Sequence, residues 1–152
     1  MKTLTLSVAL TVAAVALAPA ARADMALGNY ELQIVGRYDF HTWVWVVSGC
    51  YTAGSRLPAA GCAHVSAVAR PVAKAFSYAG IAQIVDGRYT LTVDVPDGLR
   101  CGDIYYGPTI PTHDTHSWDS TTLAGSLESS FATGCDGTPA GTYTHPFTLV
   151  RM

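Results

Sequence analysis

The sequence predicts an all-β domain of about eight short antiparallel strands that follow one another as a meander and form a small barrel. No convincing helical periodicity follows the N-terminal segment, and Gly, Pro, Asp and Ser recur about every 8 to 15 residues. Nearly every connection has the length of a hairpin, whereas a Greek-key sandwich needs a long return connection. A two-layer β-sandwich fits the same periodicity and is the alternative architecture.

The most distinctive hairpin signal is the segment IAQIVDGRYTLTV, residues 81–93. Asp86 and Gly87 separate two alternating runs and suit the positive φ angles of a tight primed turn. If Val85 faces Arg88, one face of the hairpin is apolar and the other is mixed, as a half-buried antiparallel sheet requires. The residues of the expected apolar face are Ala82, Ile84, Tyr89, Leu91 and Val93.

The other strands are placed by alternation and by the turn residues that bound them. A turn is expected at Pro96-Asp97-Gly98 and a loop over residues 135–141. Pro146 lies inside the last strand, which places that position at an edge or a bulge. The expected strands cover residues 28–35, 40–47, 62–70, 101–106, 113–118, 121–131 and 142–151.

The N-terminal segment has the features of a secretory signal peptide. Lys2 precedes an almost continuously apolar stretch, residues 4–17, and Ala21-Arg22-Ala23 forms a small-residue cleavage pattern. The apolar stretch is shorter than the ~20 residues that span a bilayer, which disfavours an uncleaved anchor. We therefore expect cleavage near Ala23, a secreted protein that spans no membrane, and one domain over residues 24–152.

Four cysteines are an even number, which in an exported chain predicts two disulfides. Three connectivities are available, and we favour the sequential one, Cys50 with Cys62 and Cys101 with Cys135. No C-x-x-C spacing is present, so the cysteines indicate neither a thioredoxin-like redox site nor a zinc knuckle.

The charge of the chain argues against nucleic acid as a partner. The formal net charge is −2 at pH 7, and the basic residues are scattered instead of clustered as a phosphate-binding surface requires. Charged residues make up only 13% of the chain, so small polar residues must cover much of the surface. Such a surface is typical of extracellular proteins, and it also fits apolar area that is kept for a ligand or partner.

The stretch HTWVWVVSGC, residues 41–50, carries two tryptophans two positions apart. If Cys50 and Cys62 are near-opposed on neighbouring strands, strand alternation places both indoles on the face opposite the disulfide, against small alanines. That arrangement predicts a packed core, provided that no bulge at Ser48-Gly49 shifts the register. If the interior instead takes a ligand, the lining candidates are Trp43, Trp45, Tyr89, Leu91 and Leu127.

No motif in the sequence identifies a reaction, and we assign no catalytic residue and no cofactor. His113 and His116 are weak metal candidates, because residues three apart on a strand point to opposite faces and chelate one ion only within a turn. No G-x-S-x-G elbow is present, and paired cysteines leave no thiol nucleophile. Carboxylates are scattered along the chain without a spacing that pairs them.

Several of these features together resemble a known group of proteins. They are W-x-W before Cys50, the DGRYTLTV hairpin, the S-W-x-x-x-x-L-x-G of residues 117–125, and the closing PFTLVR. This succession resembles small secreted mycobacterial proteins of uncharacterised function over essentially the whole mature chain. It is also similar to extracytoplasmic segments of some mycobacterial proteins, including those attached to receptor kinases. The resemblance implies a disulfide-containing bacterial β-protein and supplies no catalytic or binding residues.

Three functions are consistent with the sequence. The first is a secreted, non-enzymatic binding module that holds an apolar or amphipathic molecule of the cell envelope in or at the mouth of the barrel. The second is an extracellular domain that binds a protein partner through an exposed sheet face. The third is a small hydrolase built from scattered His and Asp residues. We favour the first.

Overall fold

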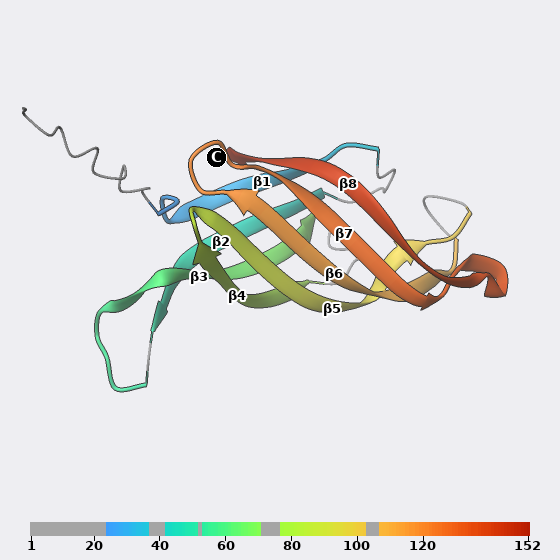
Figure 1. Ribbon diagram of the computed structural model, residues 1–152, viewed down its shortest axis with the longest axis horizontal. Helices are drawn as coiled ribbons and strands as arrows, with labels where there is room; N and C mark the ends of the chain where they lie inside the picture. The colour runs from blue at the N-terminus through green and yellow to red at the C-terminus, as the bar shows by residue number, and fades with distance from the viewer. Residues whose placement is uncertain (1–23, 37–41, 52, 71–76, 103–106) are drawn as a thin grey trace, which may run out of the picture.

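The protein is a closed barrel of eight antiparallel strands, in which each strand pairs with the next and β8 pairs with β1 (Figure 1). The computed structural model describes residues 24–36, 42–51, 53–70, 77–102 and 107–152. This confirms the predicted barrel over the sandwich. The strands are β1 (Gly28–Ile34), β2 (Thr42–Tyr51), β3 (Pro58–Arg70), β4 (Tyr78–Val85), β5 (Arg88–Arg100), β6 (Thr109–Asp119), β7 (Ala124–Thr133) and β8 (Pro139–Arg151). In this part of the chain no helix is long and apolar enough to cross a membrane.

The β4–β5 hairpin has the predicted turn and the predicted faces. Asp86 and Gly87 both have positive φ, at 51° and 77°, and Val85 pairs with Arg88. Ala82, Tyr89, Leu91 and Val93 are buried in the barrel, and Ile84 packs against the same core. An aspartate followed by glycine accommodates the left-handed backbone at both turn positions, which fixes the register of the hairpin.

The two tryptophans of β2 point into the barrel, as the strand alternation predicted. Trp43 pairs with Ala69 and Trp45 pairs with Ala67, so the largest side chains of β2 lie beside the smallest of β3. Trp45 is fully buried and Trp43 is 8% exposed. The β2–β3 register shifts only beyond Gly49, so the bulge leaves this pairing intact.

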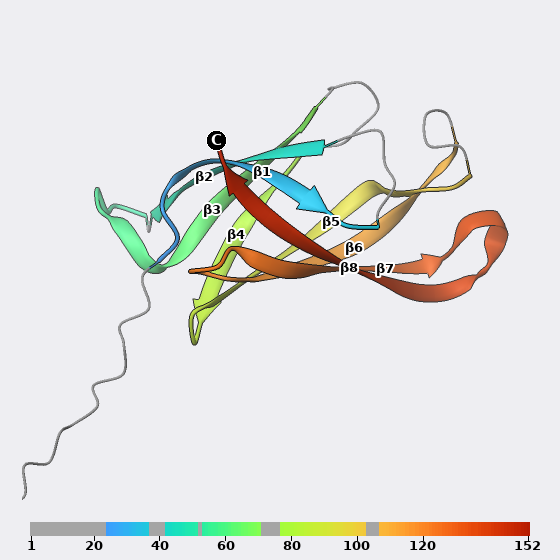
Figure 2. The ribbon, with the colours of Figure 1, turned by 90° about the horizontal axis from the view of Figure 1, so that it is seen from above.

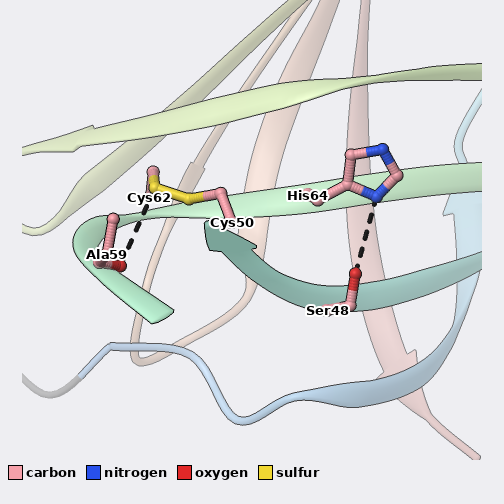
Figure 3. The surroundings of a disulfide bond; sticks show 5 residues. All are labelled: Ser48, Cys50, Ala59, Cys62 and His64. Atoms are coloured by element: carbon pink, nitrogen blue, oxygen red, sulfur yellow. Dashed lines mark hydrogen bonds between the residues drawn. A yellow bond between two sulfur atoms is a disulfide. The ribbon is translucent and has the colours of Figure 1, made fainter. Parts of the chain in front are cut away.

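Both predicted disulfides are present. Cys50 joins Cys62 and ties the end of β2 to β3 (Figure 3), with Ser48 and His64 of the same strands at 3.5 Å on the outer surface. Cys101 joins Cys135 and links the segment after β5 to the segment after β7. The first bridge therefore joins two neighbouring strands of the barrel wall, and the second joins segments that follow strands.

Between residues 96 and 109 the structure corrects the predicted strands. The expected turn at Pro96-Asp97-Gly98 is instead an irregularity inside β5, where the pairing with β6 shifts between Val95 and Leu99. No strand begins at Cys101, because β5 ends at Arg100, and residues 103–106 lie outside the described part. A bulge absorbs proline and glycine without ending a strand, which is why the turn signal was misleading.

Pro146 neither breaks β8 nor lies at a sheet edge. The residue pairs with Ser126 of β7, and its carbonyl accepts a hydrogen bond from the Val35 amide at 2.8 Å. A residue's carbonyl and nitrogen point to the same neighbouring strand, so the proline nitrogen faces Val35, the residue that follows the end of β1 at Ile34. Proline cannot return the hydrogen bond that Val35 donates, so the β1–β8 pairing ends there with one bond in place of two.

The barrel interior is filled by its own side chains near the Asp86–Gly87 turn, an end that we call the floor. Trp118 stacks on Tyr89 at a centroid distance of 5.3 Å and meets Trp45 edge-on at 5.2 Å. Met25, which precedes β1, is also buried there. We call the opposite end, where β7 ends and β8 begins, the mouth.

Candidate functional site

Near the mouth the barrel wall opens between β6 and β7. These strands pair from Trp118 and Gly125 as far as His113 and Ser130, and the pairing stops there. Beyond that point β6 continues on β5, and β7 continues on β8, so the two hairpins separate (Figures 1 and 2). A cleft of about 550 Å³ lies where they part.

Along the strand direction the cleft lies between two fixed points, a residue pair and a disulfide. On one side it stops at the last β6–β7 pair, His113 with Ser130. On the other side the Cys101–Cys135 disulfide holds the two hairpins together, with a Cα–Cα distance of 5.5 Å. Pro111 lines the cleft and has no amide hydrogen to offer an added strand. This arrangement favours a compact guest over an extended peptide.

Three strands contribute equally to the cleft wall, through residues 94–96 of β5, 111–113 of β6 and 130–132 of β7. Most of this surface is apolar, and Phe131 of β7 is its largest side chain. The apolar lining consists of Val95, Pro96, Pro111, Phe131 and Ala132, and the polar lining of Asp94, Thr112, His113 and Ser130.

The outer rim of the cleft is a row of three polar side chains that face one another across the strands. Asp94 pairs with His113, and His113 pairs with Ser130. The carboxylate of Asp94 lies 2.7 Å from Nδ1 of His113, and both side chains are exposed. The Ser130 hydroxyl donates to the main-chain carbonyl of His113 at 3.2 Å.

Asp94, His113 and Ser130 are the residue types of a serine hydrolase triad, but the Ser130 hydroxyl makes no hydrogen bond to the His113 imidazole. The Asp94–His113 contact resembles the one that orients a catalytic histidine, but the Ser130 hydroxyl is directed at a backbone oxygen. Asp94 is 90% exposed, so water screens its charge. The geometry suits hydrogen bonding to a polar group at the rim better than acyl transfer.

The inner side of the cleft carries one buried hydroxyl, and a second lies beside the cleft on β7. Thr112 lines the cleft and is 4% exposed, and the neighbouring inward residue of β7, Ser129, is 3% exposed. Neither hydroxyl has a hydrogen-bond partner within the described residues. Gly98 makes room for Thr112, because a Cβ at position 98 would lie only 1.7 Å from the Thr112 hydroxyl.

Deeper in the barrel, three aromatic side chains form a polar contact chain. The Trp45 indole donates to the Tyr78 hydroxyl at 3.0 Å, and that hydroxyl lies 3.4 Å from Nε2 of His116. His116 is 1% exposed and stacks on Tyr78. This chain separates the apolar floor from the more polar inward positions of β6 near the mouth.

The residues proposed from the sequence as a ligand lining lie in the core. They contact other core residues, and none of them lines the cleft between β6 and β7. A guest among them would have to displace packed side chains. The set is Trp43, Trp45, Tyr89, Leu91 and Leu127.

The two histidines named as weak metal candidates lie on opposite faces of β6. His113 is exposed on the outer surface and His116 is buried inside the barrel. They therefore do not converge on one ion, as the strand alternation indicated. Over the described ranges no three His, Cys, Asp or Glu side chains are grouped as a metal site.

The sequence alone did not reveal the cleft. The Asp94–His113 contact depends on the β5–β6 register, which shifts at the bulge after Val95. The sequence places two prolines near this opening, Pro108 and Pro111, which is a general sign of irregular strand backbone and does not locate a cleft.

Fold and site together define a small up-and-down antiparallel β-barrel with an opening in its wall. No protein-family model matches the chain, and searches of curated proteins and of solved structures find no match. The cleft itself is therefore the feature of the molecule that indicates a function.

Proposed function

We propose that the protein is a secreted, non-enzymatic binding module that holds one small amphipathic molecule in the cleft between β6 and β7. The observation that carries this proposal is the cleft of about 550 Å³ with an apolar wall and a polar rim. Sites for small molecules are concave, mostly apolar, about 300–1,000 Å³ in volume, and carry a few polar groups that orient the ligand.

The cleft position refines the expectation of a ligand at the mouth of the barrel. The interior near the floor is occupied by stacked aromatic rings, among them Tyr89 and Trp118. The opening near the mouth, in contrast, has no β6–β7 ladder and is held by a disulfide. A cross-linked opening is preorganised, which lowers the entropic cost of binding.

Two disulfides support an oxidising compartment outside the cytoplasm. The expected signal peptide, residues 1–23, lies outside the described part of the structure. A cell-envelope molecule as the ligand, and membership of a mycobacterial group of secreted proteins, are parts of the same proposal and rest on the sequence.

A cleft-filling variant tests the proposal. Ala132→Trp places an indole in the opening, and Thr144→Trp places one on the exposed outer face of β8 as a matched control. Native mass spectrometry of protein from culture medium is expected to show a bound amphiphile in the unmodified protein and in the control, and none in Ala132→Trp. Equal occupancy in both variants would place the ligand elsewhere.

A second candidate function is protein binding through the outer face of β2 and β3. Val46 and Val68 are 40% and 41% exposed there, and Val68 pairs with Val44 on the same surface. Retention of an envelope protein that is abolished by Val68→Glu and unaffected by Ala132→Trp would favour this function.

A further inference from the structure

Thr112 places a buried hydroxyl without a hydrogen-bond partner among the described residues in a cleft wall that is otherwise mostly apolar. Its side chain is 4% exposed and lines the cleft, yet its hydroxyl has no hydrogen-bond partner within the described part of the chain. Ser129 is the inward residue diagonal to Thr112 on β7, and its buried hydroxyl also has no hydrogen-bond partner over the same described ranges. A buried polar group without a partner costs free energy, so a ligand that reaches it gains a hydrogen bond.

A hydroxyl both donates and accepts hydrogen bonds, so its best complement is a group that does the same. An alcohol or a primary amide meets this condition. A carboxylate or phosphate accepts without donating, and an ammonium donates without accepting. The two hydroxyls therefore match a neutral polar group.

The charges around the cleft also disfavour an anionic group. Asp94 lies at the rim, and the adjacent pair in the β5–β6 ladder places Asp114 on the inner face of β6. Among the residues of the described ranges that line the cleft there is no lysine or arginine. An anion would enter beside these carboxylates without a lysine or arginine partner, at a cost from repulsion and desolvation.

We infer that the ligand is a neutral, hydroxylated amphiphile whose alcohol group is bound by Thr112, with Ser129 beside it, and whose apolar part lies against Phe131 and Ala132. This inference rests on the proposed binding function and names its ligand class. The apolar wall binds the apolar part of the ligand, and Thr112 selects a ligand whose polar group is an alcohol.

Three probes with the same tail and different head groups test the inference. Decanol, decanoate and decylamine are titrated separately into the oxidised protein at neutral pH, and binding is measured by calorimetry. Decanol is expected to bind about tenfold tighter than decanoate, the difference that one satisfied buried hydrogen bond makes. Thr112→Val is expected to remove about tenfold of the decanol affinity, and Thr112→Ser is expected to retain it.

Thr115→Val is the matched control, because Thr115 lies on the outer face of the same strand. It is expected to leave all three affinities unchanged, and near-native melting temperatures show that each variant folds. Equal or tighter binding of decanoate overturns the inference, as does tightest binding of decylamine, which would indicate a cationic ligand. Unchanged decanol affinity in Thr112→Val also overturns it. If none of the three probes binds, the proposed binding function fails as well.

Discussion

The indole nitrogen of Trp45 donates a hydrogen bond to the hydroxyl of Tyr78, and these residues are 33 positions apart in the chain. Trp45 is fully buried, so this hydroxyl provides the acceptor that its N–H needs. The contact joins β2 to the start of β4 across the barrel interior. It sets the boundary between the packed floor and the mouth.

Tyr78→Phe removes that acceptor and leaves the indole N–H buried without it. A loss of about 1 to 3 kcal/mol in the free energy of unfolding is expected, measured by urea denaturation. Tyr143→Phe is the control, because Tyr143 is half exposed on β8, and its effect is expected to stay within about 0.5 kcal/mol. Equal stability of the two variants would show that the Trp45–Tyr78 contact contributes little.

Gly98→Ala is expected to destabilise the protein through the β5 bulge. The added Cβ would lie 1.7 Å from the Thr112 hydroxyl and 2.8 Å from the Thr112 Cβ, so the strands must shift. Overpacking of this kind costs about 1 to 3 kcal/mol. Thr112→Ala in the same chain is expected to relieve part of the loss, because only the Cβ contact remains. Strict additivity in a double-mutant cycle would contradict this account.

The two disulfides are expected to differ in their effect on binding. Replacing Cys101 and Cys135 with serine lowers the free energy of unfolding by about 4 kcal/mol, and replacing Cys50 and Cys62 lowers it by about 3 kcal/mol, in the chain-entropy model. Only the Cys101–Cys135 bridge holds together the two hairpins that flank the cleft, so only the loss of this bridge is expected to weaken amphiphile binding. Calorimetry below the melting temperature of each variant measures both effects. Parallel losses of binding would argue that the cleft is not the site.

Tyr89 makes stability depend on pH in the alkaline range. Burial raises the pKa of Tyr89 above its ordinary value of 10.0, and the nearby Asp24 carboxylate raises it further. The folded state therefore holds the phenolic proton more tightly than the unfolded state. The resulting stability is fully present below pH 10 and is lost as the pH rises through the folded-state pKa. Tyr89→Phe is expected to flatten the decline in melting temperature above pH 10. An unchanged decline would show that other groups cause it.

The fold could be predicted from the sequence where local signals determined the register. Asp86 and Gly87 fixed the β4–β5 turn, and the Cys50–Cys62 bridge fixed which face of β2 carries Trp45. Both signals act within a single hairpin. The predicted barrel followed from a chain of such hairpins.

The candidate site depended on relationships that no local pattern encodes. The cleft exists because β6 leaves β7 at His113, and its rim forms because Asp94 lies opposite that residue across a shifted ladder. Pro96 and Gly98 indicated a turn, whereas the pairing of β5 with β6 carried the strand through them. The pairing of β5 with β6 decided the backbone conformation there, against the local preference for a turn. The cleft could not be predicted from the sequence because it depends on this long-range pairing.

Amide chemical-shift mapping during a decanol titration tests the central claim most directly. If the amphiphile binds in the cleft between β6 and β7, the largest shifts are expected at Asp94, Thr112, His113, Phe131 and Ala132. Amides of Val46 and Val68, on the outer face of the opposite wall, are expected to stay unchanged. Shifts that cluster on that outer face, or the absence of any saturable shift, would contradict the account.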